Sequence, residues 1–163
     1  MRLSLALAVT LLLAAVAFGQ DMGSMPMAVS PAKMKFDNVP NVPKCAKAAV
    51  LHGDPGKGAF VLMIKATAGC KVPRHWHTPT EQLSFHSGSA SITMPGEKPQ
   101  TLSPGSFIHL PSKNQHSFVC KTACAFFLAG DGAFDIHYTD DAGQEISAEQ
   151  ALQPKMKMKG KKE

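Results

Sequence analysis

Three histidines and one glutamate are spaced as the ligands of a single metal ion would be. His75 and His77 lie two residues apart, so on a strand both imidazoles leave one face and Trp76 points the other way. Glu81 follows after a Thr-Pro-Thr bend, which can fold its carboxylate back towards the two imidazoles. His116 lies on a later expected strand. We therefore expect a metal site built from these four side chains.

Three neutral imidazoles and one carboxylate leave one or two coordination positions open on an ion held in a barrel mouth. This ligand set suits Fe(II), Mn(II), Zn(II), Ni(II) or Cu(II). A metal there could act as a Lewis acid or activate oxygen, with Glu81 as a catalytic ligand that detaches and takes a proton. The sequence offers no separate nucleophile or second acid/base pair, so any chemistry would depend on the metal. The alternative is a barrel that keeps these residues without bound metal.

Short apolar runs broken by glycine and proline must position these residues. The runs expected as strands cover residues 48–52, 59–66, 82–86, 90–94, 107–110, 116–120, 125–129 and 134–138. Many short strands at this spacing indicate an all-β antiparallel sandwich or barrel. The helix signal comes late, with Ser147 as N-cap and Gln150 three residues on.

At these residues the sequence resembles the cupin superfamily. Gly69, His75, His77, Glu81 and Gly88 match the first cupin motif, G-x5-H-x-H-x3/4-E-x6-G, at every spacing. The second motif, G-x5-P-x-G-x2-H-x3-N, is matched less completely. The positions that fit it are Gly105, Pro111 and His116, whereas Lys113 replaces its second glycine and Cys120 its asparagine. The likeness covers about residues 45–138 and is closest to small single-domain cupins.

The resemblance implies a double-stranded β-helix, or jelly-roll barrel, in which His75, His77, Glu81 and His116 bind the metal. Many cupins are dioxygenases, and others are isomerases, decarboxylases or hydrolases, so an enzyme acting on a small molecule is one reading. The other is a non-catalytic protein that holds a metal or a small ligand in the periplasm. A barrel that serves only as an interaction domain is a third reading, because fold alone does not set function. A homodimer is compatible with the resemblance, although the sequence identifies no face for it.

The start of the chain is typical of a secretory signal peptide. Arg2 precedes a short apolar run, and Ala17 and Gly19 are small residues at the −3 and −1 positions of a cut before Gln20. The run is short for a membrane span. We expect Sec-type export to the periplasm or the medium, and no transmembrane segment after cleavage.

Export to an oxidising compartment affects the expected oxidation state of the four cysteines. In an oxidising compartment Cys45, Cys70, Cys120 and Cys124 are expected to form two disulfides, although three pairings and four free thiols are alternatives. Cys120 and Cys124 flank a three-residue loop between two apolar runs, so they could face each other across a hairpin ladder. Cys45 would then pair with Cys70.

The charge distribution argues against a nucleic-acid partner. The chain has a formal charge of +5, but the excess lies in Arg2 and in the lysines after residue 153, and the body between is neutral. Phosphate contacts need basic side chains gathered on a folded face. The expected organisation is a signal peptide at 1–19, a flexible lead-in rich in Met and Pro at 20–44, the barrel at 45–140, and a helix with a basic tail at 141–163.

Other aromatic and histidine residues have simpler expected roles. Phe85 and Phe118 share strand parity with Glu81 and His116, which predicts that they face the barrel core. His86 has the opposite parity and is expected on the surface. The remaining histidines are expected to be structural or solvated: His52 borders a turn, and the sequence identifies no partner for His109 or His137.

Overall fold

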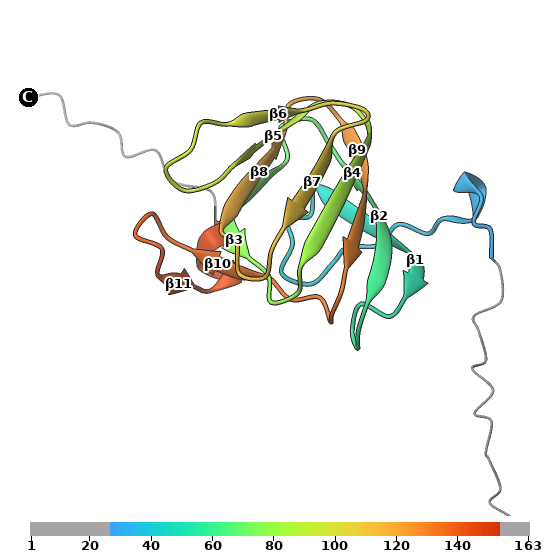
Figure 1. Cartoon of the computed structure of the whole chain (residues 1–163), viewed down its shortest axis with the longest axis horizontal. Helices are drawn as coiled ribbons and strands as arrows, with labels where there is room; N and C mark the ends of the chain where they lie inside the picture. Colours follow the sequence, from blue (N-terminus) through green and yellow to red (C-terminus); the bar gives the residue numbers. More distant parts are fainter. Residues whose placement is uncertain (1–26, 154–163) are drawn as a thin grey trace, which may run out of the picture.

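The chain folds into two antiparallel β-sheets that face each other (Figure 1). The computed structural model describes residues 27–153. The expected signal peptide, the first part of the lead-in and the basic tail lie outside these residues. No helix in the described part of the chain is long and apolar enough to cross a membrane.

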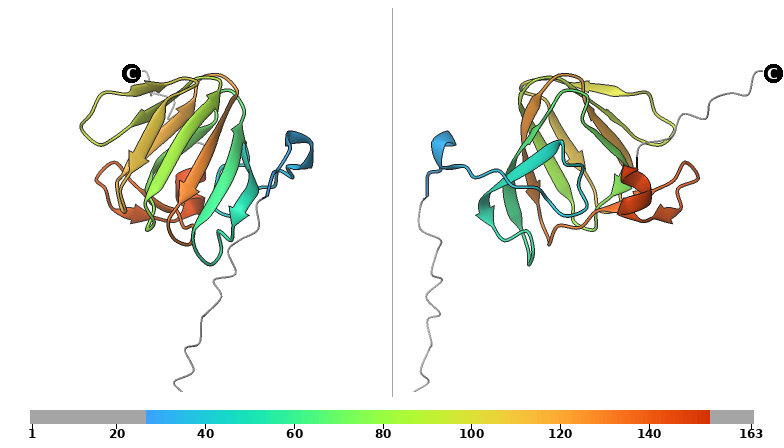
Figure 2. Two further views of the ribbon diagram at one scale, coloured as in Figure 1. Left: turned by 45° about the vertical axis from the view of Figure 1, so that its right-hand side comes forward. Right: turned by 180° about the vertical axis from the view of Figure 1, so that it is seen from behind.

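The first sheet has the strand order β1-β2-β9-β4-β7. Its strands are β1 (Ala46–Gly53), β2 (Phe60–Ala66), β9 (Cys124–Gly130), β4 (Glu81–Ser87) and β7 (Phe107–Leu110). The second sheet has the order β11-β10-β3-β8-β5-β6. Its strands are β11 (Glu145–Ile146), β10 (His137–Thr139), β3 (Lys71–Trp76), β8 (His116–Cys120), β5 (Ala90–Thr93) and β6 (Gln100–Leu102). The two sheets together form the expected jelly-roll barrel, as the two further views in Figure 2 show.

Two short helices flank the barrel. The 3-10 helix η1 (Pro31–Lys33) precedes it, and α1 (Ala148–Leu152) follows it. Ser147 accepts the backbone N–H of Gln150 while the Gln150 side chain accepts the backbone N–H of Ser147. The expected capping box at the start of α1 is confirmed.

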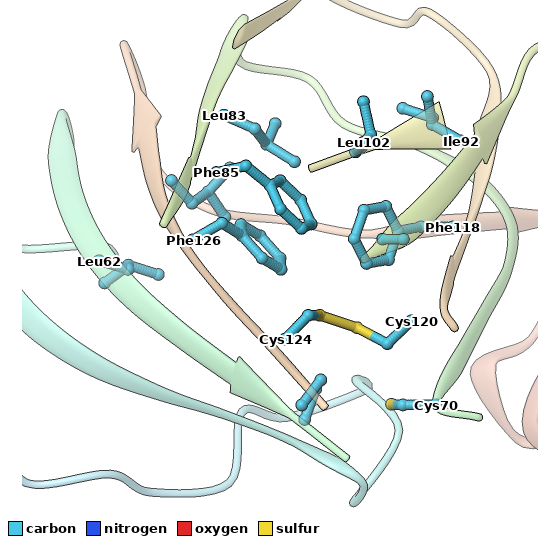
Figure 3. Packing of buried hydrophobic residues seen from close by; sticks show 14 of the residues in the cluster. Leu62, Cys70, Leu83, Phe85, Ile92, Leu102, Phe118, Cys120, Cys124 and Phe126 are labelled. Carbon is cyan, nitrogen blue, oxygen red and sulfur yellow. A yellow bond between two sulfur atoms is a disulfide. The ribbon is translucent and has the colours of Figure 1, made fainter. Parts of the chain in front are cut away.

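The core lies between the two sheets, because alternate residues on strands such as β4, β5 and β8 point inward. On β4 the buried positions are Glu81, Leu83 and Phe85, whereas His86 is exposed. Phe85 stacks on Phe126 with ring centroids 5.2 Å apart, and Phe118 faces both from the other sheet (Figure 3). The expected parity of Phe85, Phe118 and His86 is confirmed.

Both expected disulfides are present, but one of them joins two strands that do not pair with each other as predicted. Cys45 pairs with Cys70 and Cys120 with Cys124, with Cα–Cα distances of 5.6 and 6.0 Å. The predicted hairpin ladder between β8 and β9 is wrong, because β8 pairs with β3 and β5 whereas β9 pairs with β2 and β4. The Cys120–Cys124 disulfide therefore links the two sheets (Figure 3).

The loop between β8 and β9 explains this difference. The backbone N–H groups of Lys121 and Thr122 donate to the carbonyl oxygen of Ser89, at 2.8 and 3.2 Å. The Thr122 hydroxyl oxygen accepts the Ser89 N–H in return. These bonds tie the loop to the β4–β5 connection, so the chain passes from one sheet to the other and does not fold back on itself.

Residues 37–45, which we call the strap, cross from one sheet to the other and close part of the barrel wall. Asp37 forms a β-bridge with Ala48 on β1. The hydroxyl of the buried Tyr138 on β10 donates to the carbonyl oxygen of Asn41, 2.7 Å away. The Cys45–Cys70 disulfide fixes the end of the strap. The strap belongs to the sequence that we expected to be a lead-in, and it contributes to the barrel.

Candidate metal centre

Three buried imidazoles meet at one end of the six-stranded sheet. His75 on β3 and His116 on β8 are cross-strand partners, with ring centroids 4.2 Å apart. His77 follows β3 directly, and its ring centroid lies 4.8 Å from that of His75. One potential ligand atom from each residue lies within 4.8 Å of the others. This cluster is compatible with a bound metal ion.

The backbone fixes the tautomer of each imidazole. Each Nδ1 faces a backbone carbonyl oxygen, which can only accept, so Nδ1 must carry the proton. The acceptors are Pro73 for His75 at 2.7 Å, Asn114 for His116 at 3.0 Å, and Asp135 for His77. In the neutral rings each Nε2 atom therefore carries the lone pair that metal ligation requires.

Burial keeps these imidazoles neutral. It lowers the pKa of His75 well below its ordinary value, and the neighbouring histidines lower it further. Burial also lowers the pKa of His77 to about 4 and the pKa of His116 below 6.5. At neutral pH all three rings are uncharged and able to bind a cation.

Glu81 approaches the cluster from the facing sheet, at the start of β4. Its Oε2 lies 3.3 Å from Nε2 of His77, and its Oε1 has no hydrogen-bond partner. The residue is 3% exposed. Burial, with the nearby charge of Asp135, raises the pKa of Glu81 to about 8. A carboxylate facing an imidazole lone pair needs a proton or a cation between the two acceptors, since neither has a hydrogen to donate.

Two loops hold the segment that carries His77. Lys113 donates its backbone N–H to the carbonyl oxygen of His77 at 2.8 Å, and the Ser112 hydroxyl donates to that of Thr78 at 2.6 Å. The Thr78 N–H donates to Oδ1 of Asp135 at 2.7 Å. The expected bend before Glu81 is confirmed, and its position depends on side chains from distant parts of the sequence.

A cavity of about 90 Å³ lies inside the barrel beside this cluster. All four site residues line it: His75, His77, Glu81 and His116. Val39 and Val42 of the strap line it as well. Sequence reasoning missed the strap residues, because a segment rich in proline without periodicity indicates a loop and not a cavity wall.

The known proteins that resemble this chain share its three-dimensional structure. No protein-family model and no curated protein matches the sequence. The polyketide cyclase RemF from Streptomyces resistomycificus superposes with a TM-score of 0.63 and 18% identity, over 71% of this chain and 87% of that one. An RmlC-like cupin protein from Ralstonia eutropha gives 0.59 and 19%, over 74% and 76%. The DMSP lyase DddQ from Ruegeria pomeroyi gives 0.57 and 19%, over 69% and 64%.

This chain has a cupin fold. The fold predicted from the two motifs is therefore confirmed, and its extent agrees with a small single-barrel cupin. At these identities the likeness establishes the fold alone. The named activities of the cyclase and the lyase belong to those proteins.

Lys113 shows how this chain departs from the second cupin motif. The motif places a glycine at this position, and Lys113 adopts the left-handed conformation that favours glycine, with φ 61°. Its ammonium lies 5.7 Å from the centre of the Trp76 ring, within reach of a cation–π contact. The turn shape is thus kept although the side chain is not.

His137 has partners that the sequence did not reveal. Its ring stacks on Trp76, with centroids 3.9 Å apart and planes 6° apart. Its Nδ1 lies 2.5 Å from Glu145 and its Nε2 3.3 Å from Asp135. Partial burial lowers the pKa of His137, but hydrogen bonds to the two carboxylates outweigh it and raise the pKa above 6.5. These contacts agree with the expected structural role of His137. The sequence did not identify the partners, because Trp76 and Glu145 lie in elements that meet β10 only in the fold.

Proposed function

We propose that this protein is an exported, metal-dependent cupin enzyme that acts on a small molecule in the barrel cavity. His75, His77, His116 and Glu81 are the proposed metal ligands. The observation that carries the proposal is the buried Oε1 of Glu81, which has no partner beside three imidazoles with free Nε2 lone pairs. A buried acceptor without a donor costs free energy, and a cation removes that cost.

The donor set fits a divalent transition metal. Neutral imidazole and carboxylate suit Fe(II), Mn(II), Zn(II), Ni(II) or Cu(II). When bound, such an ion supplies Lewis acidity to a substrate oxygen or activates O2. Glu81 has a raised pKa of about 8, so a group of this kind can hold or release a proton near neutral pH. An oxygenase or isomerase-type reaction is consistent with these roles.

Metal content tests the ligand assignment. Protein purified anaerobically, without added metal, is expected to carry close to one divalent ion per chain by elemental mass spectrometry. His75→Ala and His116→Ala should abolish this occupancy, because each removes an Nε2 donor. His86→Ala is the control, since His86 is exposed on the outer face of β4. A His75→Ala protein that keeps its metal would overturn the assignment.

Turnover tests the enzyme reading. The Fe(II)-loaded protein is expected to consume O2, or to convert substrate without it, on a panel of phenols, thiols and keto acids. Glu81→Gln keeps the shape of the side chain and removes its charge, so it should lower turnover more than a hundredfold. Full metal occupancy with no turnover across the panel would favour a periplasmic protein that binds a metal or small ligand without catalysis.

Export is the third part of the proposal. The two disulfides of the described residues support it, because such bonds persist in oxidising compartments. The mature protein in the periplasmic or secreted fraction is expected to begin at Gln20. Intact mass and N-terminal sequencing check this, and a full-length chain in the cytoplasm would contradict it.

A further inference from the structure

Among the described residues, the buried polar side chains that line the barrel cavity gather at one end of it. His75, His77 and His116 lie at the end where β3 finishes and β8 begins. The lining continues along β3 and β8 towards Cys70 and Cys120, whose sulfur atoms form disulfide bonds. Between these ends the walls are aliphatic and aromatic, and several of the side chains point towards one another in Figure 3.

The described residues offer almost no hydrogen-bonding side chain elsewhere in this cavity. Apart from the three histidines and Glu81, the polar residue among those that line it is Lys47, which is exposed to solvent. Residues typical of the remaining wall are Leu62, Ile64, Val72, Phe118 and Leu128. The β2–β9 ladder pairs the backbone of one wall, and β3 pairs with β8 on either side of an irregularity between Val72 and His75. Among the described residues, a ligand atom that needs a hydrogen bond would find no buried side-chain partner away from the histidines and Glu81.

This asymmetry sets which molecules can bind. Burying a hydroxyl or carboxylate without a partner is costly, whereas burying a methylene in an apolar wall is favourable. A site without polar partners therefore rejects ligands that carry a polar group at the buried end. Sugars, amino acids and dicarboxylates each carry such groups.

We propose that the substrate is a small apolar molecule with a single polar head group, which lies at the histidine end while its apolar body fills the cavity. The proposal rests on the proposed function and adds the substrate class to it. Val72 is placed to test it, because this residue lines the cavity three positions before His75 on the same strand.

Matched small carboxylates provide the first test. Protein loaded with Co(II) is titrated with butanoate, 4-hydroxybutanoate and succinate, and the cobalt absorption bands report binding of the head group. Butanoate is expected to bind at least tenfold more tightly than the other two. Affinities within threefold of one another would overturn the proposed substrate class.

A pair of matched variants locates the effect. Val72→Thr places a hydroxyl in the cavity wall at nearly constant side-chain volume. The ratio of the affinities for butanoate and 4-hydroxybutanoate should therefore fall to less than threefold. Val119→Thr is the control, because Val119 is half-buried on the partner strand β8 and does not line the cavity. A ratio that falls in Val119→Thr and not in Val72→Thr would place the binding site elsewhere.

A second measurement needs no metal and separates the two proposals. Butan-1-ol and butane-1,4-diol are compared on the metal-free protein by ligand-observed NMR, and the mono-alcohol is expected to bind at least fivefold more tightly. Failure to load Co(II) would count against the proposed function alone. Equal binding of the two alcohols would overturn the inference about the cavity.

Discussion

The backbone carbonyl oxygen of Asp135 accepts the Nδ1 proton of His77, and the carboxylate of the same residue accepts the backbone N–H of Thr78. One residue therefore sets both the tautomer of a candidate ligand and the position of the peptide that follows it. The carbonyl is present in any variant at this position, whereas the carboxylate can be removed. This separation allows the two roles to be tested independently.

Removal of the Asp135 carboxylate is expected to weaken metal binding without abolishing it. Asp135→Ala should lower metal affinity about tenfold, because outer-shell partners of this kind typically contribute 10–100-fold. Asp135→Asn keeps an acceptor for the Thr78 N–H, so its metal affinity should fall by less than that of Asp135→Ala. Competition with a chromophoric chelator measures both. Asp131→Ala is the control, since Asp131 accepts the N–H of Thr80 at 2.9 Å on the same loop, and an equal loss there would contradict the specific role of Asp135.

Metal affinity is expected to rise with pH between about 6 and 8. The pKa of Glu81 is raised to about 8, so a cation that binds its carboxylate must displace a proton below that pH. The pKa of His77 is lowered to about 4, so this imidazole does not compete for protons in the same range. One displaced proton gives up to about a tenfold change per pH unit.

The Glu81→Gln variant provides the control for this pH dependence. Its affinity for Co(II), although weaker, should change little between pH 6 and 8, because the titrating carboxyl is gone. Dissociation constants measured at pH 6, 7 and 8 for both proteins test the idea. A wild-type affinity that is flat across this range would show that Glu81 is not a ligand.

The turn at Lys113 is expected to accept glycine with little change in stability. Lys113→Gly should leave the free energy of unfolding within about 1 kcal/mol of wild type, because the left-handed conformation suits glycine. Lys113→Val should lower it by about 1–2 kcal/mol, since a β-branched side chain is strained there. Urea unfolding measures both, with Lys98→Val as an exposed control at a position that does not itself have a positive φ. A Lys113→Val protein as stable as wild type would contradict the strain argument.

The two disulfides are expected to contribute unequally to stability. The Cys45–Cys70 bond closes a separation of 25 residues and Cys120–Cys124 one of 4. Chain entropy then predicts losses of about 3.5 and about 2 kcal/mol when each pair is replaced by alanine. Urea unfolding of the oxidised proteins gives the comparison. A larger loss for the short-range pair would show that its link between the two sheets, and not loop length, dominates.

Local spacing predicted more of the candidate metal site than of its surroundings. Strand parity and one bend align His75, His77 and Glu81, whereas His116 joins them through the pairing of β8 with β3. The support for His77 comes from Lys113 and Asp135, which are far away in the sequence, so no local pattern could reveal it.

Local sequence patterns were also insufficient to predict which strands pair. Short apolar runs predicted most strands, yet the pairing of β8 and β9 was wrong, because a three-residue loop is compatible with a hairpin and with a crossing between sheets. The hydrogen bonds from that loop to Ser89 decide between them. They involve a residue that no spacing rule connects to the loop.

The main chain supplies every acceptor that orients the three imidazoles. Random substitution can replace side chains, but it cannot delete a carbonyl group. Substitutions in the surrounding residues therefore leave in place the acceptors that orient the candidate ligands. Directed evolution could accordingly reshape the apolar walls of this barrel for chosen ligands while the imidazoles keep their Nδ1-protonated tautomers.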